Sequence, residues 1–592
     1  MLKDSRTNRF LIRLSIFALC AIAPISVIYI VVRLLVTPSG YGAPFLFMLD
    51  AYMLAEALFF LLVHLPRKWW INRPAAPYAP LKTRAQRREM LVRSWDATPE
   101  PRRYVQMYFY GAPVESLGRE DVKRWLRWRL WGRYSLHGGK ETEGLMVDEG
   151  ELEEYVQYTE EVLGHEFPEG ATGNEGLVVR EEPVRLVRRP LMWYGIIGIV
   201  DTIAFVGMWW RGFSLYARSA ESVRSFPLRP LSVLGKKSPS GAFSYWYREH
   251  TKKARENGHL PMLFVHGIGV GLHFYLPFLK DLMLSPRQQG VGMIALEVLP
   301  VCNRITAPLP PSEQIAEEVL SILQYHNWEN CVLVTHSYGS ALAAHMFRHA
   351  EAKARIGPMI LVDPVAFSFH PPDVAWNFLR RQPTTASEWQ LWYFASMDSD
   401  VARTLTRNFR WLESSLWRED LDLHFNQAGR TKDTRVTVFL SGQDIITDVN
   451  TLGTYLSRSD QKVKWYRQTP QRRSQEGWKS KEWTGAEQLE VVYLPTLNHA
   501  ELFEETTPRH LLVKTVEAYT LSARKENYLL GVWGIIYHPY LGSTDRDLEN
   551  KHEYDDKKSR MSETQSGGQY ESQQCPNVEN DSNKIRAQRR ES

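Results

Sequence analysis

The sequence predicts an α/β protein in which a mostly parallel sheet carries helices on both faces and a helical cap. A transmembrane hairpin and a helical region are predicted to precede this domain. Three observations support the prediction. Short apolar, β-branched runs recur between residues 262 and 494, and each ends in a loop of small or polar residues. Helical spacing follows one such loop at 341–350, and two long apolar stretches lie within residues 14–65.

The most informative segment is 331–340, CVLVTHSYGS. Its first half is typical of a buried strand, and the helical pattern begins directly after it. A strand, a tight turn and a helix in this order expose the side chain at the apex, which is Ser337. The pattern G-x-S-x-G has Thr335 at its first small position, so an ordinary strand–turn–helix corner remains an alternative for this motif alone.

A second loop follows the apolar run 262–265 and has the sequence His266, Gly267, Ile268 and Gly269. Glycines permit backbone turns that aim N–H groups inward, and a serine acyl-transfer site needs such donors where negative charge develops. We predict an oxyanion hole formed by the backbone N–H groups of Ile268 and Tyr338. A simple glycine turn is the alternative.

An acid and a histidine follow two further strand-like runs. Asp444 comes shortly after 436–440, and His499 comes shortly after 491–494. Open α/β sheets gather their ligand chemistry at the carboxyl ends of the strands. The chain order is therefore serine, acid, histidine, which differs from the order in chymotrypsin-like and subtilisin-like proteases.

The identity of the acid stays open between three residues. Asp363 follows the strand-like run 358–362, and Asp448 lies only four residues beyond Asp444. We favour Asp444 over the other two.

Together these residues resemble the core of the α/β-hydrolase superfamily over roughly 240–525. The matching segments are 264–271, 334–339, 361–364, 442–444 and 498–501. The wider chain, with 119–131 and 409–421, is similar to membrane-associated fungal α/β-hydrolase-domain proteins of undefined substrate.

The resemblance implies a role for each residue of the triad. Ser337 attacks an acyl carbonyl, His499 takes its proton and later protonates the leaving group, and Asp444 orients the imidazole. A serine nucleophile excludes the branches of the superfamily that use an aspartate. We expect no cofactor and no metal, because the sequence has no phosphate-cradling loop and no Cys or His cluster with metal-ligand spacing.

The stretches 14–32 and 41–65 are predicted to cross a bilayer, although Asp50 and Glu56 interrupt the second. A cleaved signal peptide is disfavoured, because its apolar core would be too long and a second span follows. Basic residues flank the pair on both outer sides, which places both ends, and with them the hydrolase domain, in the cytosol. These residues are Lys3, Arg6, Arg9, Arg13, Arg67, Lys68 and Arg73.

A third apolar stretch, 191–210, carries Asp201 and has arginines at both ends. We expect a helix that lies in the membrane interface or packs on the hydrolase domain, and a crossing is the alternative.

The composition restricts the partners. A net charge of +5 over 592 residues is too small to indicate nucleic acid. Tryptophans and arginines interleave at 122–131, where we expect aromatics packed on a core and solvated arginines. The basic loop 462–481 is expected to be a solvated surface loop. The four cysteines provide no disulfide framework.

The predicted organisation has five parts: an anchor at 1–75, a mostly helical region at 76–239, the hydrolase domain at 240–525 with a cap at about 367–433, a short aromatic segment at 526–541 and a disordered tail at 542–592.

The leading hypothesis is a membrane-anchored serine hydrolase that cleaves carboxylic esters of lipid-like acyl groups, with the bilayer and an amphiphilic ester as partners. A catalytically inactive membrane scaffold and an acyltransferase with the same triad are the alternatives.

Overall fold

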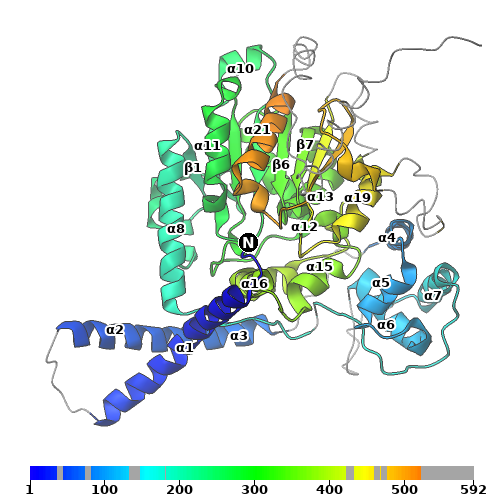
Figure 1. Cartoon of the computed structure of the whole chain (residues 1–592), viewed down its shortest axis with the longest axis horizontal. Coiled ribbons are helices and arrows are strands. Elements are labelled where there is room, and N and C mark those ends of the chain that lie inside the picture. Colours follow the sequence, from blue (N-terminus) through cyan, green and yellow to red (C-terminus); the bar gives the residue numbers. More distant parts are fainter. Residues whose placement is uncertain are drawn as a thin grey trace, which may run out of the picture. The chain divides into compact units, whose positions relative to one another are not determined.

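The structure is a computed structural model that describes residues 1–36, 44–73, 82–132, 147–180, 182–421, 433–458, 467 and 476–521. All of these belong to one compact unit (Figure 1). The predicted aromatic segment 526–541, the tail 542–592 and most of the basic loop 462–481 lie outside the described residues.

Nine strands form one mixed sheet in the order β2-β1-β3-β5-β4-β6-β7-β8-β9. The strands are β1 (Ser214–Ala217), β2 (Lys236–Lys237), β3 (Ser244–Arg248), β4 (Met262–Val265), β5 (Met293–Glu297), β6 (Cys331–His336), β7 (Ile356–Val362), β8 (Val436–Ser441) and β9 (Leu489–Leu494). All neighbours from β5 to β9 pair in parallel, whereas β3 is antiparallel to both β1 and β5. The predicted α/β class with a mostly parallel sheet is confirmed.

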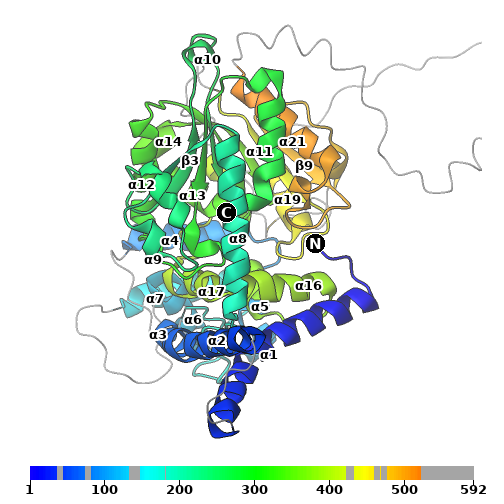
Figure 2. The same cartoon turned by 90° about the vertical axis from the view of Figure 1, so that its left-hand side faces the viewer.

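Helices cover both faces of the sheet. Along β4, Met262 and Phe264 enter one apolar core while Leu263 and Val265 enter the other. Figure 2 shows α11 (Leu276–Leu284) and α21 (Thr506–Thr520) on one side and α12 (Ser312–Tyr325) and α14 (Ala350–Ala354) on the other. Burial on both faces explains why the central strands have continuous apolar runs and no alternation.

The sheet begins before the expected domain boundary at residue 240. β1 pairs with β3 through Leu215 and Trp246, and β2 pairs with β1. That boundary is therefore too late. Strands of four and two residues are too short to produce a periodic pattern in the sequence. Their place in the sheet also depends on pairing with β3, which comes later in the chain.

The described part of the insertion between β7 and β8 includes three short helices that each continue into a π-helical turn. They are α15 (Asp373–Ala375) with η8 (Trp376–Arg380), α16 (Ala386–Leu391) with η9 (Trp392–Ser396), and α17 (Ser399–Arg403) with η10 (Thr404–Asn408). We call this segment the cap. Residues 422–432 of the expected cap lie outside the described residues.

The helical region contains α4 (Arg84–Asp96), α5 (Pro101–Tyr108), α6 (Arg119–Trp131) and α7 (Glu149–Leu163). On α6, Trp125 and Trp131 are buried as expected. Arg129 is also buried, which corrects the expectation that the arginines of this helix are solvated. Its guanidinium donates to the Tyr108 hydroxyl at 2.6 Å and to the His370 carbonyl at 3.0 Å, so acceptors from two elements satisfy the charge.

Three helices among the described residues are long and apolar enough to cross a membrane. They are α1 (Arg6–Val36), the continuous helix formed by α2 (Pro44–Phe59), η1 (Phe60–His64) and α3 (Leu65–Ile71), and α8 (Leu191–Trp210). Asp50 on α2 accepts a hydrogen bond from the Tyr29 hydroxyl of α1 at 2.6 Å and lies 3.3 Å from the Arg33 guanidinium. These partners reduce the cost of placing a carboxylate in an apolar helix pair.

Candidate active site

Ser337 lies at the apex of the turn between β6 and α13 (Gly339–Arg348). Its φ of 50° is in the left-handed region, which L-residues other than glycine adopt rarely. Its backbone N–H donates to the Val362 carbonyl of the neighbouring strand at 2.9 Å. The strained turn is therefore held in place by the sheet.

Two glycines allow the loops around Ser337 to approach closely. A Cβ on Gly339 would lie 2.5 Å from the Val265 carbonyl oxygen, and a Cβ on Gly267 would lie 2.9 Å from the Ser337 Cβ. The glycine loop after β4 thus lies directly against the serine turn. Thr335, which replaces the first small residue of the motif, is buried within β6 and pairs with Val265.

Three of the predicted side chains come together. The Nε2 atom of His499 lies 2.9 Å from the Oγ of Ser337, and its Nδ1 lies 2.8 Å from an Asp444 carboxylate oxygen. Asp444 is held by the Ile446 backbone N–H at 2.7 Å and the Thr447 hydroxyl at 3.0 Å. Sequence positions separated by more than 160 residues therefore form one chain of hydrogen bonds.

Neither alternative acid contacts His499. Asp448 caps α19 (Val449–Ser457) by accepting from the Thr451 backbone N–H at 3.1 Å, and it lies 3.6 Å from the Arg103 guanidinium. Its carboxylate therefore serves to cap the N-terminus of α19.

Asp363 has a different place beside the site. Its carboxylate accepts from the Ser441 and Ala500 backbone N–H groups, each at 2.9 Å. These residues begin the acid loop and follow the histidine, so Asp363 ties the two loops together. Burial raises the pKa of Asp363 to about 6, with Asp444 adding to the rise and His499 opposing it. Its position after a strand was visible in the sequence, but this bridging role was not.

The electrostatics of His499 favour its charged form. Burial alone would lower the pKa of His499, but the Asp444 carboxylate and its hydrogen bond outweigh that effect and the pKa is raised. His336, whose ring centroid lies 5.3 Å from that of His499, is buried without a carboxylate, and its pKa is held well below the usual value. Of these two neighbouring imidazoles, His499 is therefore protonated more readily than His336.

Hydrogen bonds anchor the glycine loop on both sides of Ile268 and leave the backbone N–H of Ile268 without a protein acceptor among the described residues. The N–H of Gly267 donates to the Tyr275 hydroxyl and that of Gly269 to the Val301 carbonyl, each at 3.0 Å. Within the described part of the chain, the backbone N–H groups of Ile268 and Tyr338 donate to no other residue. His266 lies below the loop, where its Nε2 accepts from the Val298 backbone N–H at 3.0 Å. The sequence had no signal for the role of Tyr275.

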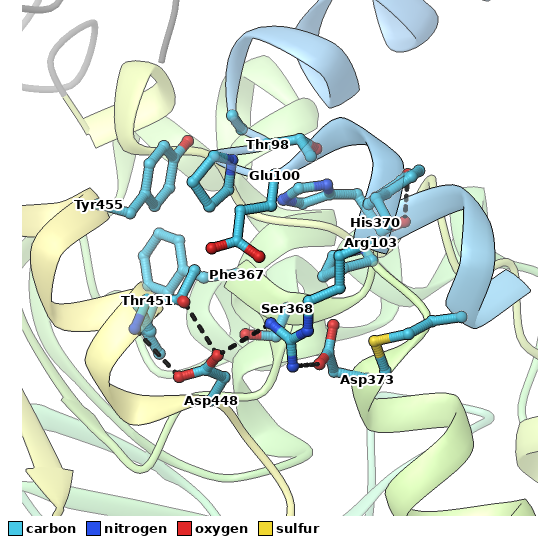
Figure 3. A pocket seen from close by; sticks show the side chains of 16 residues that line it. Thr98, Glu100, Arg103, Phe367, Ser368, His370, Asp373, Asp448, Thr451 and Tyr455 are labelled. Atoms are coloured by element: carbon cyan, nitrogen blue, oxygen red, sulfur yellow. Dashed lines mark hydrogen bonds and ion pairs between the residues drawn. The ribbon is translucent and has the colours of Figure 1, made fainter. Parts of the chain in front are cut away.

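The serine and the histidine of the candidate site are largely buried. Ser337 and His499 are each 6% exposed, and the ring of Phe409, which follows the cap helices, lies 5.7 Å from the ring of Tyr338. A separate cavity of about 60 Å³ lies between α5 and α19, with Arg103 between Asp373 and Asp448 (Figure 3). No triad residue lines that cavity, so it is not the space that an acyl group on Ser337 would occupy.

Residues 262–514 match the sequence model of the Alpha/beta hydrolase family. This match and the observed sheet identify residues 262–514 as an α/β-hydrolase domain. A sequence comparison with curated proteins finds no match.

Solved structures similar to this chain include several esterases. The carboxylesterase CesB from Bacillus subtilis is 10% identical, with a TM-score of 0.32 over 56% of this chain and 97% of its own. The naproxen esterase from Bacillus subtilis is 10% identical, with a TM-score of 0.32 over 54% and 95%. A thermophilic esterase from Thermogutta terrifontis is 13% identical, with a TM-score of 0.30 over 47% and 95%.

Proposed function

We propose that this protein is a membrane-anchored serine hydrolase that cleaves carboxylic esters through Ser337, His499 and Asp444. The observation that supports it most is the pair of short contacts of His499, one to the serine hydroxyl and one to the carboxylate. A nucleophile in contact with a base that a third group orients is the arrangement that activates serine.

In the proposed reaction, the Ser337 Oγ attacks the ester carbonyl while His499 Nε2 takes its proton. The negative oxygen of the tetrahedral intermediate accepts hydrogen bonds from the Ile268 and Tyr338 N–H groups. His499 then protonates the departing alcohol, which leaves an acyl-enzyme. Water attacks the acyl carbon and gives its proton to His499, which passes that proton to the departing Ser337 Oγ as the carboxylic acid is released.

The contact between α1 and the cap favours a lipid-like substrate. Ile12 and Ile16 of α1 pack with Ala386 and Tyr393 of the cap, and the Arg13 guanidinium lies 5.5 Å from the ring of Trp389. A candidate membrane helix thus contacts the cap. Amphiphilic esters in the bilayer would therefore be the substrates nearest to the cap.

The first test is labelling of the purified full-length protein with a fluorophosphonate probe. We expect labelling of the wild type and its loss in Ser337→Ala and His499→Ala, because turnover falls roughly 10⁶-fold when either member of such a pair is removed. His510→Ala is the matched control, since this histidine is 57% exposed and lies beside Asp281 instead of the candidate triad. A folded wild type that stays unlabelled would favour the scaffold hypothesis.

Acyl transfer uses the same residues and is separated by its products. With a fatty-acyl ester as substrate, hydrolysis gives the free acid whether or not a second alcohol is added. A new ester that accumulates in proportion to the added alcohol would assign the protein as an acyltransferase.

A further inference from the structure

The helix α8 packs on the hydrolase domain along its whole length. Near its start, the ring of Trp193 lies 5.4 Å from that of Phe394 in the cap. Near its end, Phe205 lies 5.1 Å from Trp246 of the sheet, and Met208 is fully buried in the same core. A helix held at both ends by one folded domain cannot cross a bilayer without drawing that domain into the hydrocarbon, where its polar groups would lose water.

The opposite face of α8 is apolar and exposed. From Met192 to Trp209 its large apolar side chains recur every three or four residues, so they form one stripe, and Trp210 adds to its end. They are Met192, Ile196, Ile199, Ile203, Val206, Trp209 and Trp210. No exposed position of this helix carries a charge. A stripe of this length on the surface of a folded domain indicates an interaction surface.

The one carboxylate of α8 is turned away from this stripe. Asp201 lies 3.0 Å from the Arg229 guanidinium and 2.8 Å from that of Arg304, both of which are buried. The charge that interrupts the apolar sequence is thus neutralised within the hydrolase domain. The outer face remains free of charge.

We propose that the outer face of α8 lies flat in the interface of a lipid bilayer, with the helix axis in the membrane plane. The bilayer is chosen as the partner because α8 contacts α2, which is part of a candidate membrane helix. Glu56 of α2 accepts a hydrogen bond from the Leu191 N–H at 2.8 Å, and Phe59 lies 5.5 Å from Tyr194. From this junction α2 runs across α8, toward the side to which the outer face of α8 is turned (Figures 1 and 2). In a bilayer crossed by α2, the axis of α8 would therefore lie parallel to the membrane surface.

A segment that contacts both α2 and α8 has further exposed apolar side chains. Phe226 packs between Phe59 and Tyr194, with ring centroids 5.3 Å and 5.2 Å away. Near Phe226 in the sequence are four strongly exposed apolar side chains, Val223, Leu228, Val233 and Leu234, and three exposed basic ones, Arg224, Lys236 and Lys237. Apolar side chains that enter the acyl boundary beside basic residues at the headgroups are typical of interfacial segments on anionic membranes.

The test measures the depth of α8 in vesicles of phosphatidylcholine and phosphatidylserine. Full-length protein carries Cys20→Ser and Cys575→Ser, which leaves Cys302 and Cys331 buried. A single new cysteine at Met192, Ile199 or Val206 is labelled with an environment-sensitive fluorophore. Lipid nitroxides placed near the headgroup or near the end of the acyl chain then quench the label.

We expect all three positions to be quenched at least about twofold more strongly by the shallow nitroxide, because an in-plane helix is buried only about 5–10 Å. A control label at Lys252, whose side chain is 90% exposed on α10 (Lys252–Glu256), should not be quenched. Deep quenching at Ile199 with shallow quenching at Met192 would show a crossing helix. No quenching at any position would show that protein covers this face. Either result overturns the proposal, which does not depend on the activity of Ser337.

Discussion

At the scale of single residues, the candidate site separates two carboxylates that the sequence could not separate. Asp444 contacts the imidazole of His499, whereas Asp363 contacts only backbone and hydroxyl donors of the flanking loops. Both follow strands, so a sequence pattern places both at the same edge of the sheet. Only the direction of each side chain assigns Asp444 to the histidine.

This arrangement predicts unequal effects of two matched substitutions. In Asp444→Asn the imidazole loses its charged partner and its required tautomer, and kcat should fall about 10⁴-fold. Asp363→Asn keeps a side chain of the same shape but has one acceptor oxygen in place of two, so it should cost activity far less and act through the position of the Ala500 loop. Steady-state kinetics on an ester substrate measure both. A larger loss in Asp363→Asn would contradict the assignment of the acid.

The pH profile provides a second readout for the same pair. His499 must be neutral to accept the serine proton, so kcat/KM should fall as the pH drops through its pKa. Because Asp444 raises that pKa, we expect the midpoint of the acid limb above the usual value of 6.5. The limb should move to lower pH in Asp444→Asn, since the carboxylate that stabilises the protonated ring is gone. An unmoved limb would show that another group controls it.

At the scale of elements, the site depends on how closely the glycine loop after β4 approaches the end of β6. A Cβ on Gly267 would lie 2.7 Å from the Nδ1 of His336, which is itself 2.7 Å from the Tyr275 hydroxyl. The loop, the strand end and the turn η4 (Gly271–Tyr275) therefore form one packed unit. The N–H of Ile268 is positioned by this packing.

Gly267→Ala should therefore displace the loop from the serine turn. We expect a loss of about 1–3 kcal/mol in the free energy of unfolding, as for overpacking elsewhere, together with slower fluorophosphonate labelling. Gly477→Ala is the control, because a Cβ there would meet no atom within 4 Å. Denaturant unfolding and labelling rates measure the two effects. Equal stability and labelling of both variants would show that the close approach is not required.

At the scale of the whole molecule, the helical region and the hydrolase domain share one core. The His370 carbonyl, just before the cap helices, accepts from the Tyr104 hydroxyl at 2.7 Å, the Tyr108 hydroxyl at 2.9 Å and the Arg129 guanidinium. Residues of α5 and α6 thus converge on one acceptor of the hydrolase domain. The helical region therefore helps to hold the start of the cap in place.

Arg129→Met tests this connection, since it keeps most of the volume and removes the buried donors. We expect a loss of about 1–3 kcal/mol, because acceptors in the core are left with fewer partners. Arg127→Met on the same helix is the matched control. Its exposed pair with Glu149 should contribute only about 0–1 kcal/mol. Urea unfolding compares the variants, and an equal effect of the two would contradict the role of Arg129.

The sequence by itself determined the class of fold and the loops that carry the candidate site. Strand-like runs, glycine loops and long apolar stretches are local patterns, and each produces its element wherever the rest of the chain lies. The order of Ser337, Asp444 and His499 is likewise a property of the chain alone. These features can be predicted from the sequence because they depend on interactions between residues that are close together in the chain.

The tertiary structure alone decided which side chains meet and which faces are covered. It assigned Asp444 and not Asp363 to His499, brought β1 and β2 into the sheet ahead of residue 240, and buried Arg129 between the helical region and the loop that carries His370. It also turned Asp201 of α8 toward Arg229 and left the opposite face apolar and exposed. Each of these depends on contacts between residues far apart in the chain, and no local pattern carries that information.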